Sequence, residues 1–226
     1  MVLFPGLGNH RGILGWTSEA ALQQELVEHQ TRIAALSDRI RQAPVTVLAS
    51  DADVVRIGSR LCLDNCSACH DARGISSMAA PNLLDSDWLH GGTPEAIMAS
   101  ILDGREGFMQ PFGTVLSSAE ITQVAHYVAS LSGTARDPVK AALGKSVFQT
   151  CATCHGPDGK GNPALGAPNL TDSVWLYGGS IADIEKTVRS GRHGSMPAWR
   201  DRLGEEGAKA ITAWIARNGG IDASDK

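Results

Sequence analysis

The sequence of 226 residues is poor in aromatic side chains, with five Trp, four Phe and two Tyr. It contains no run approaching the roughly 18 apolar residues of a membrane helix, and residues 1–16 lack the basic and apolar segments of a secretion signal. Neither charge dominates, because 20 Lys+Arg stand against 24 Asp+Glu. We therefore expect a soluble globular chain and no nucleic-acid partner. So few aromatic residues also suggest that something other than side chains fills its cores.

An internal repeat divides the chain. A shift of 87 residues places Pro81-Asn-Leu83 on Pro168-Asn-Leu170 and Trp88-Leu-His-Gly-Gly92 on Trp175-Leu-Tyr-Gly-Gly179, and it also aligns Arg105 with Arg192 and Met109 with Met196. At roughly 100 to 200 residues per domain, two small modules fit the length as well as one large domain does. We expect modules over 51–134 and 135–226, preceded by an irregular lead and an amphipathic helix over 1–50.

Four of the five cysteines lie in two copies of one motif, Cys66-Ser-Ala-Cys69-His70 and Cys151-Ala-Thr-Cys154-His155. Cys-x-x-Cys-His is the attachment signature of c-type haem, in which the two thiols add to the vinyl groups and the adjacent His reaches the iron. Two copies in one short chain predict two covalently attached haems. The haems would also supply the missing core.

Three other kinds of site compete with haem at these cysteines. A zinc site would need two ligand pairs close together in the sequence. These cysteine pairs are 82 residues apart, and a His directly follows each of them. A thioredoxin-like redox pair would need strands on both sides, and neither motif has them. Disulfide bonds would leave His70 and His155 unexplained. Haem attachment therefore remains the preferred interpretation.

The modules are expected to be all-α, because alternating strand patterns are essentially absent. The expected helices have a capping residue at the start or a glycine at the end. The first helices are expected to begin at Asp51 and Asp137. The second helices begin at Thr93 and Ser180 and end at Gly104 and Gly191. The last helix of the first module begins at Ser117, with Glu120 completing a capping box, and its counterpart begins at about Glu205. The segment Thr17 to Gln42 is expected to form a helix before the modules. Its apolar stripe either lies in solvent or binds a partner protein; the residues are Leu22, Leu26, Ile33, Leu36 and Ile40.

Each module resembles a class I cytochrome c, with a Cys-x-x-Cys-His motif, a Pro-Asn-Leu loop and a later Met. The whole chain is similar to the dihaem subunit of cbb3-type cytochrome c oxidases, from the Gly-rich lead before Trp16 to the segment His126-Tyr-Val-Ala-Ser-Leu-Ser-Gly133. In that family the lead follows a membrane helix. The resemblance therefore implies a periplasmic portion, on the periplasmic side of the bacterial inner membrane, whose anchoring helix is missing here.

The resemblance implies one His and one Met ligand on each iron. These are His70 with Met109 in the first module and His155 with Met196 in the second. Met78 and Met98 also compete in the first module, but only Met109 aligns with the single Met of the second. His90 and His126 are the fallback ligands. The family pattern is interrupted by Gln110, which follows Met109 and has no counterpart after Met196.

Further residues are expected around each haem. The resemblance suggests that the second ring nitrogen of each His bonds a backbone carbonyl, that of Pro81 or Pro168. Trp88, Trp175, Arg105 and Arg192 could donate hydrogen bonds to the propionates; the alternative is a packed Trp and a solvated Arg. Cys62 aligns with Val147, so it is expected to be a buried free thiol.

The implied function is electron transfer by a protein that is not an enzyme alone. It would pass single electrons from a donor cytochrome c to the catalytic subunit of a haem-copper oxidase, beside a monohaem cytochrome subunit. A free soluble dihaem carrier is one alternative, although it leaves residues 1–42 without a role. A dihaem peroxidase is another; it needs an iron with an open position and an acid/base group beside it, and Met on both irons argues against it.

Charge differs between the modules. Residues 51–134 carry ten acids and four bases, whereas residues 135–226 carry ten acids and twelve bases. Summed surface charge mainly controls the rate of encounter, so a donor with a basic face should be steered to the first module, where Asp85 and Asp87 lie. The alternative is that the acidity only aids solubility.

Overall fold

The computed structural model describes residues 16–71, 80–134, 137–219 and 221. The chain divides into two compact units, Met1–Pro44 and Val45–Lys226, and each is described by itself. None of the helices in the described part of the chain combines the length and the apolar composition needed to cross a lipid bilayer.

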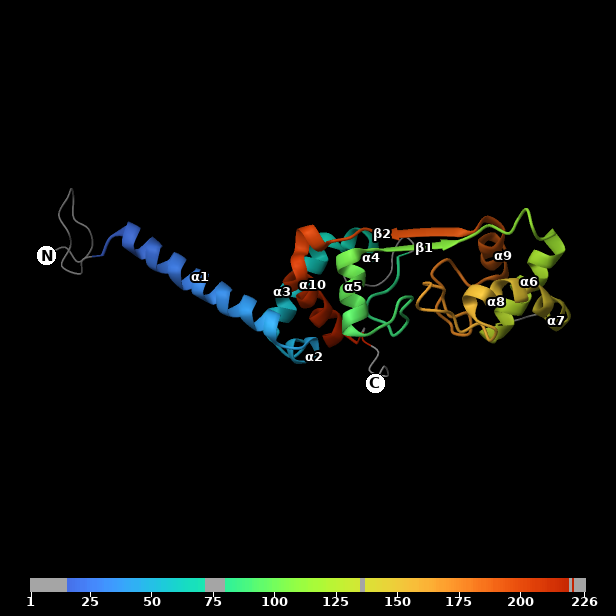
Figure 1. The fold of residues 1–226 in the computed structure, drawn as a ribbon, viewed down its shortest axis with the longest axis horizontal. Coiled ribbons are helices and arrows are strands. Elements are labelled where there is room, and N and C mark those ends of the chain that lie inside the picture. The colour runs from blue at the N-terminus through green and yellow to red at the C-terminus, as the bar shows by residue number, and fades with distance from the viewer. Residues whose placement is uncertain (1–15, 72–79, 135–136, 220, 222–226) are drawn as a thin grey trace. The chain divides into compact units, whose positions relative to one another are not determined.

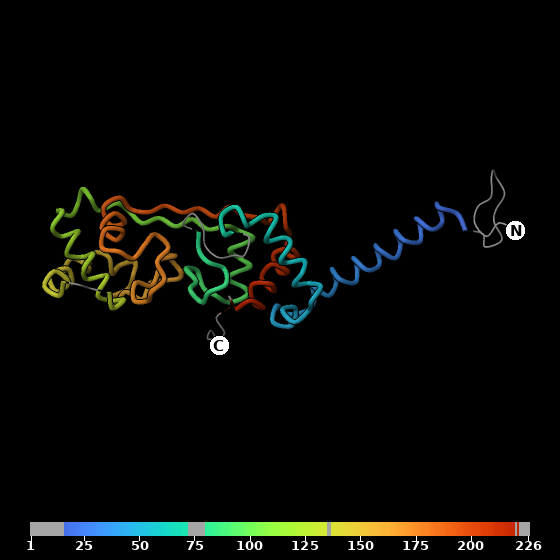
Figure 2. The backbone as a smooth tube through the Cα atoms, turned by 180° about the vertical axis from the view of Figure 1, so that it is seen from behind, coloured from blue at the N-terminus to red at the C-terminus, as the bar shows by residue number. Residues whose placement is uncertain are grey.

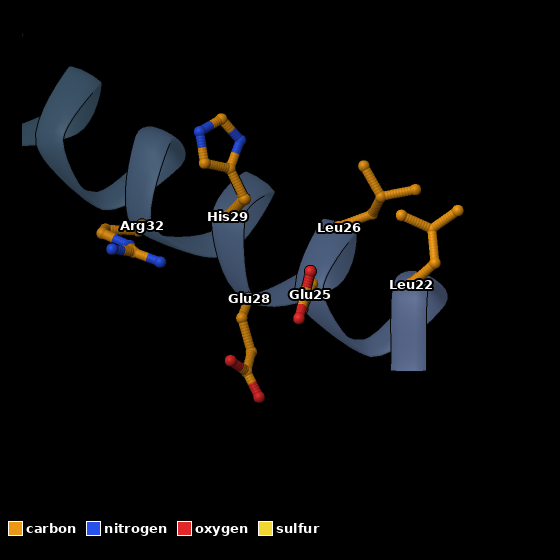
Figure 3. Close-up of a pocket in the computed structure, with 6 residues that line it drawn as sticks. All are labelled: Leu22, Glu25, Leu26, Glu28, His29 and Arg32. Carbon is orange, nitrogen blue, oxygen red and sulfur yellow. The ribbon is translucent and has the colours of Figure 1, made fainter. Parts of the chain in front are cut away.

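The first unit contains α1 (Ser18–Gln42), which confirms the helix predicted for this segment. The Thr17 side chain caps it by accepting a hydrogen bond from the backbone N–H three residues on. Leu22 and Leu26 project from one side of the helix (Figure 3) and are 54% and 45% exposed. The predicted apolar stripe is thus solvent-facing at these positions, while Ile40 near its end is buried.

The second unit holds the two sequence repeats. Its elements in chain order are α2 (Val45–Leu48), α3 (Ala52–Asn65), α4 (Ser67–His70), α5 (Pro94–Asp103), β1 (Arg105–Met109), α6 (Ser118–Leu131), α7 (Pro138–Val147), α8 (Gln149–His155), α9 (Ile181–Ser190), β2 (Arg192–Met196) and α10 (Arg200–Arg217).

The helix boundaries follow the local sequence closely. Asp51 and Asp137 cap α3 and α7, each accepting hydrogen bonds from two backbone N–H groups of the first turn. Capping boxes open α6 and α9, as predicted. The last helix begins earlier than predicted, at Arg200, but Gly204 interrupts it with φ of 61°, so its regular part starts at Glu205.

The last helices of the two repeats are exchanged. α6 packs against α7 and α9, and α10 packs against α2, α3 and α5. We call α2–α5 with α10 the first bundle, and α6–α9 the second bundle; they form the two ends of this unit in Figures 1 and 2. The predicted modules 51–134 and 135–226 therefore describe the sequence repeats, whereas each packed bundle takes its last helix from the other repeat.

Each bundle has its own buried core. The first is made by Cys62, Ile97, Ile101, Leu102, Ala208, Ile211 and Ile215. The second is made by Phe112, Ile121, Val124, Ala125, Val128, Ala129, Phe148, Cys151, Ile184 and Val188. Both lists mix residues from the two repeats, so neither repeat closes a core alone in this structure.

The two bundles are joined by a two-stranded antiparallel sheet of β1 and β2, which spans them in Figure 1. Its register places Gly107 opposite Gly194 and Met109 opposite Arg192. The sequence predicts only helices here, so the sheet is a departure from an all-α fold. Its cause is the exchange: both connections run extended in opposite directions between the bundles, side by side, and pair their backbone groups.

Candidate functional site

Each haem-attachment motif lies at the end of a short helix. His70 ends α4 and His155 ends α8, and they are 9% and 8% exposed. The next residue has a positive φ in both copies, 66° at Asp71 and 77° at Gly156. The backbone therefore leaves the helix immediately after each His. Both copies thus hold the imidazole at the same place relative to the two cysteines.

A proline carbonyl orients each imidazole. The Nδ1 atom of His70 lies 2.7 Å from the carbonyl oxygen of Pro81, and that of His155 lies 3.0 Å from the carbonyl oxygen of Pro168. A carbonyl oxygen can only accept, so Nδ1 carries the proton and Nε2 keeps its lone pair for a metal. Both contacts match those expected from the sequence.

Burial also sets the charge state of His155. Loss of solvent around the ring lowers its pKa, and the hydrogen bond to the Pro168 carbonyl only partly opposes this effect. A lowered pKa favours the neutral imidazole, which is the form that binds a metal.

The motif cysteines differ in exposure. Cys151 is buried, Cys66 is half-buried, and Cys69 and Cys154 are exposed. Burial raises the pKa of the Cys151 thiol to about 11, with a smaller contribution from the charge of Cys154. In each motif the first cysteine is therefore the less exposed of the two.

Cys62 is a free thiol and is 3% exposed, so the prediction of burial is confirmed. It lies in the core of the first bundle, one helical turn before Cys66. Its pKa is raised by the hydrogen bond to Cys66 and then by burial. The Cys62 thiol is therefore a side chain that α3 contributes to the core of the first bundle.

One of the predicted propionate donors has an unmet hydrogen bond. Trp88 Nε1 is buried and has no partner among the residues that the structure describes. Arg105 and Arg192 each donate through Nε to a hydroxyl of their own repeat, to Ser100 Oγ at 2.9 Å and to Thr187 Oγ1 at 3.0 Å. Trp175 packs against the core of the second bundle.

The two histidines named as fallback ligands, His90 and His126, lie in different surroundings. His90 faces the carbonyl of Pro163, and a Cβ added to Gly166 would stand 2.4 Å from its ring, so His90 packs against the loop of the other repeat. His126 is buried in α6, where its Nδ1 finds no partner within the described part of the chain. Met98 lies within α5, and Met78 falls outside the described residues.

An acidic contact between the repeats was missed in the sequence. Asp87 is partly buried and faces Asp85 and Asp172, and burial followed by these two charges raises its pKa to about 6. Asp85 and Asp172 are equivalent positions of the two repeats. The repeat alignment identifies the acids but not their proximity, which arises only when the two loops meet.

The residues of each site fit a c-type haem. Each site offers two thiols and an imidazole whose Nε2 is left for iron. In the first site the buried Nε1 of Trp88 lacks an acceptor among the described residues, and a bound group could supply one. A thioether sulfur would complete such a set, and Met109 and Met196 are the residues that the sequence predicts for it. Met109 packs against the core that contains Cys151, and Met196 packs against the core that adjoins Cys66. This placement differs from the expected pairing of Met109 with His70, because each Met follows its exchanged strand.

Comparison with known proteins agrees with these sites. The family model described as cytochrome c oxidase, cbb3-type, subunit III matches twice, over residues 53–128 and 140–215. The chain is 40% identical over 216 residues to the cbb3-type cytochrome c oxidase subunit CcoP of Rubrivivax gelatinosus, covering 95% of this chain and 71% of that protein. It is 41% identical over 223 residues to subunit FixP of Azorhizobium caulinodans, covering 92% and 76%. CcoP of Rhodobacter capsulatus is 33% identical over 92% of this chain and 78% of its own length.

Proposed function

The chain belongs to the family of cbb3-type cytochrome c oxidase subunit III, and we propose that it relays single electrons as the dihaem cytochrome c subunit of such an oxidase. The observation that carries this proposal is the duplicated Cys-x-x-Cys-His motif with each His held through Nδ1 at a proline carbonyl. The names of the relatives favour this function over a free carrier and over a peroxidase.

The chain's own residues prepare two matching sites. When bound, haem supplies an iron that gains and loses one electron. Cys66 and Cys69, or Cys151 and Cys154, hold the group covalently, so it stays in place during reduction and oxidation. The neutral His and the thioether of Met109 or Met196 serve both oxidation states, and the soft thioether favours the reduced one. The buried cores exclude water around each site, which limits solvent reorganisation during transfer.

The partners follow from the oxidase role. The chain receives electrons from a donor cytochrome c and delivers them toward the catalytic subunit of the haem-copper oxidase, beside the monohaem cytochrome subunit. It acts on the periplasmic side of the bacterial inner membrane. It performs no bond chemistry alone. The relatives named as oxidase subunits support these assignments.

Covalent attachment is tested first. Acid-acetone extraction of the purified protein should leave two haems per chain with the polypeptide. Replacing Cys151 and Cys154 with Ala should halve the retained haem and leave the first motif loaded. Haem that extracts into acetone, or zinc found by elemental analysis, would overturn the assignment of both sites.

Electron relay is tested in the assembled oxidase. Oxygen uptake driven by a reduced donor cytochrome should collapse when Cys66 and Cys69 become Ala. Uptake driven by a small artificial reductant that reaches the catalytic subunit directly should persist in the same preparation. Equal loss with both reductants would point to failed assembly of the oxidase, and unchanged uptake with the donor cytochrome would refute the relay.

A further inference from the structure

Equivalent residues of the two repeats make different contacts. Tyr177 stays within its own repeat, where the guanidinium of Arg192 lies 4.4 Å from the centre of its ring. Its counterpart His90 contacts the other repeat instead. A ring N–H of His90 donates to the carbonyl of Pro163, and a Cβ added to Gly166 would stand 2.4 Å from the ring. Only one of these two equivalent side chains therefore joins the repeats.

The segment that His90 contacts is a short hairpin in the loop after the second attachment motif. Asn162 and Ala167 exchange backbone hydrogen bonds of 2.9 and 3.1 Å, and the chain turns between them. The motif His and the Pro that holds it are 13 residues apart in this loop and 11 apart in the first repeat. The two additional residues thus belong to the loop that reaches the other repeat.

Gly166 suits this contact in two ways. Its φ is 63°, which favours glycine, and the space that a side chain would fill is occupied by the ring of His90. At the equivalent positions of the sequence, Ala79 replaces Gly166 and Tyr177 replaces His90. The combination of a His with a Gly therefore occurs once in the two repeats.

The loops of the two repeats also approach each other at a second place. Asp87, three residues before His90, is partly buried and interacts with the charge of Asp172, which lies shortly after Pro168. Figures 1 and 2 both show the green loop of the first repeat beside the orange loop of the second, between the two bundles. The contact at His90 is therefore part of a wider meeting of the two loops.

A series of bonds leads from His90 to the His of the second attachment motif. The hydrogen bond from His90 enters the hairpin at Pro163. Backbone hydrogen bonds across the hairpin lead to Ala167, which is joined to Pro168, and the Pro168 carbonyl accepts a hydrogen bond from Nδ1 of His155 at 3.0 Å. His90 is thereby connected to the imidazole that is left for the second iron.

Toward the first attachment site, His90 is two residues from Trp88. Trp88 packs against the core that Cys66 adjoins, and its buried Nε1 lacks an acceptor among the described residues. Electron transfer slows steeply with the width of the gap to be crossed, and bonded or closely packed atoms narrow that gap. The contact at His90 thus lies on a route between the surroundings of the two irons.

We propose that the contact between His90 and the hairpin of residues 162–167 is the junction across which the two haems exchange electrons, with His90 as its positioning residue. This inference rests on the proposed function, because it concerns how the relay passes from one haem to the other. The step moves one electron: the iron of the reduced haem is oxidised as the iron of the other is reduced, and no proton or bond is exchanged. His90 holds the hairpin against the first repeat and does not change its own oxidation state.

Electron exchange within the half-reduced holoprotein tests the junction. Proton NMR of the haem methyl groups gives the forward and reverse rates between the two haems, and a chain with Cys151 and Cys154 replaced by Ala identifies the signals of the first haem. His90→Ala should slow both rates several-fold, because the hairpin loses a hydrogen bond and the ring that packs on Gly166. The rates should be independent of protein concentration, as exchange within one chain requires.

Gly166→Ala tests the junction from the other side. The added Cβ meets the ring of His90, so it should displace the hairpin and slow exchange in a chain that keeps His90. In the His90→Ala background the same change should add little, because two residues in one contact are not additive. Tyr177→Ala and Leu165→Ala are the matched controls, and both should leave the rates unchanged. The first removes the equivalent side chain of the other repeat, and the second removes an exposed side chain of the hairpin.

The two rates separate a positioning role from an effect on the potentials. A variant that changes only the ratio of the rates has shifted the haem potentials, and this result would overturn the junction. Unchanged rates for His90→Ala, or for Gly166→Ala, in a chain with native circular dichroism would also overturn it. Either result would leave covalent haem and electron relay to the oxidase standing. A parent chain that loses its haems on acid-acetone extraction would instead refute the proposed function.

Discussion

Gly58 in α3 lies so close to α10 that a Cβ built on it would stand 2.0 Å from the carbonyl oxygen of Ala210. The same relationship recurs between α7 and α6, where a Cβ on Gly144 would stand 2.0 Å from the carbonyl oxygen of Gln123. Glycine at these two positions permits backbone contact between helices. In both helix pairs, α3 with α10 and α7 with α6, the two helices come from different repeats. These close backbone contacts therefore hold each last helix in the bundle of the other repeat.

Gly58→Ala should destabilise the first bundle despite the better helix propensity of Ala. Overpacking a close backbone contact costs typically ~1–3 kcal/mol, more than the roughly 1 kcal/mol that Ala gains over Gly within a helix. Denaturant unfolding of the holoprotein, followed by circular dichroism, measures the difference. Gly107→Ala is the matched control, since a Cβ there meets nothing within 4 Å. Equal stability of the two variants would contradict the close crossing of α3 and α10.

Asp87 should make stability fall as pH rises. Its pKa is raised from 3.8 in the unfolded chain to about 6 in the fold, so the folded state holds the proton more tightly. The stabilisation from that proton is complete below about pH 4 and is lost as pH approaches and passes about 6. Asp87→Asn should therefore reduce the drop in Tm between pH 4 and pH 7. Asp158→Asn, at an exposed carboxylate, is the control; an identical drop in both variants would argue against a buried Asp87.

Cys62 should resist thiol reagents in the native holoprotein. It is buried in the first core and its pKa is raised, so little reactive thiolate reaches solvent. One thiol per chain should react on denaturation and none on a short native incubation, as counted by mass spectrometry. Cys62→Val, which copies the residue at Val147, should abolish labelling and change unfolding free energy by less than about 1.5 kcal/mol. Rapid native labelling would contradict burial.

Reduction by a basic donor cytochrome should slow as salt rises. The surplus of acids in residues 51–104 persists in the first bundle, although α10 adds four bases and three acids to it. Attraction between exposed charges is screened over about 8 Å at 0.15 M ionic strength, so stopped-flow rates should fall steeply toward that concentration. Asp85→Asn should lower the rate at low salt and Asp158→Asn should not. Rates indifferent to salt would remove the docking proposal.

Local chemistry in the sequence was enough to predict the helices and the attachment motifs. Asp51, Ser117 and Ser180 cap helices because a short polar side chain satisfies backbone N–H groups within its own turn. The hydrogen bonds of His70 and His155 follow from the family resemblance, and both are present. These features depend on residues near one another in the chain or on a duplicated pattern.

The exchange of last helices could not be predicted from the same patterns. α6 and α10 occupy equivalent places in two similar repeats, so their apolar patterns do not indicate which bundle each helix joins. The choice depends on the path of β1 and β2, whose five-residue segments carry no alternating apolar pattern, as in Arg105-Glu-Gly-Phe-Met109. Their pairing is a tertiary contact, and so is the proximity of Asp87 to Asp172.

The exchanged helices also set the order in which the molecule can be built. As the chain emerges from its N-terminal end, α3, α4 and α5 are made long before α10, which supplies their missing core face. α6, by contrast, has its partners α7 and α9 soon after it. Contacts distant in sequence form slowly because loop closure is costly. The second bundle should therefore mature first, and the core beside the first attachment motif should remain open until synthesis of the chain is nearly complete.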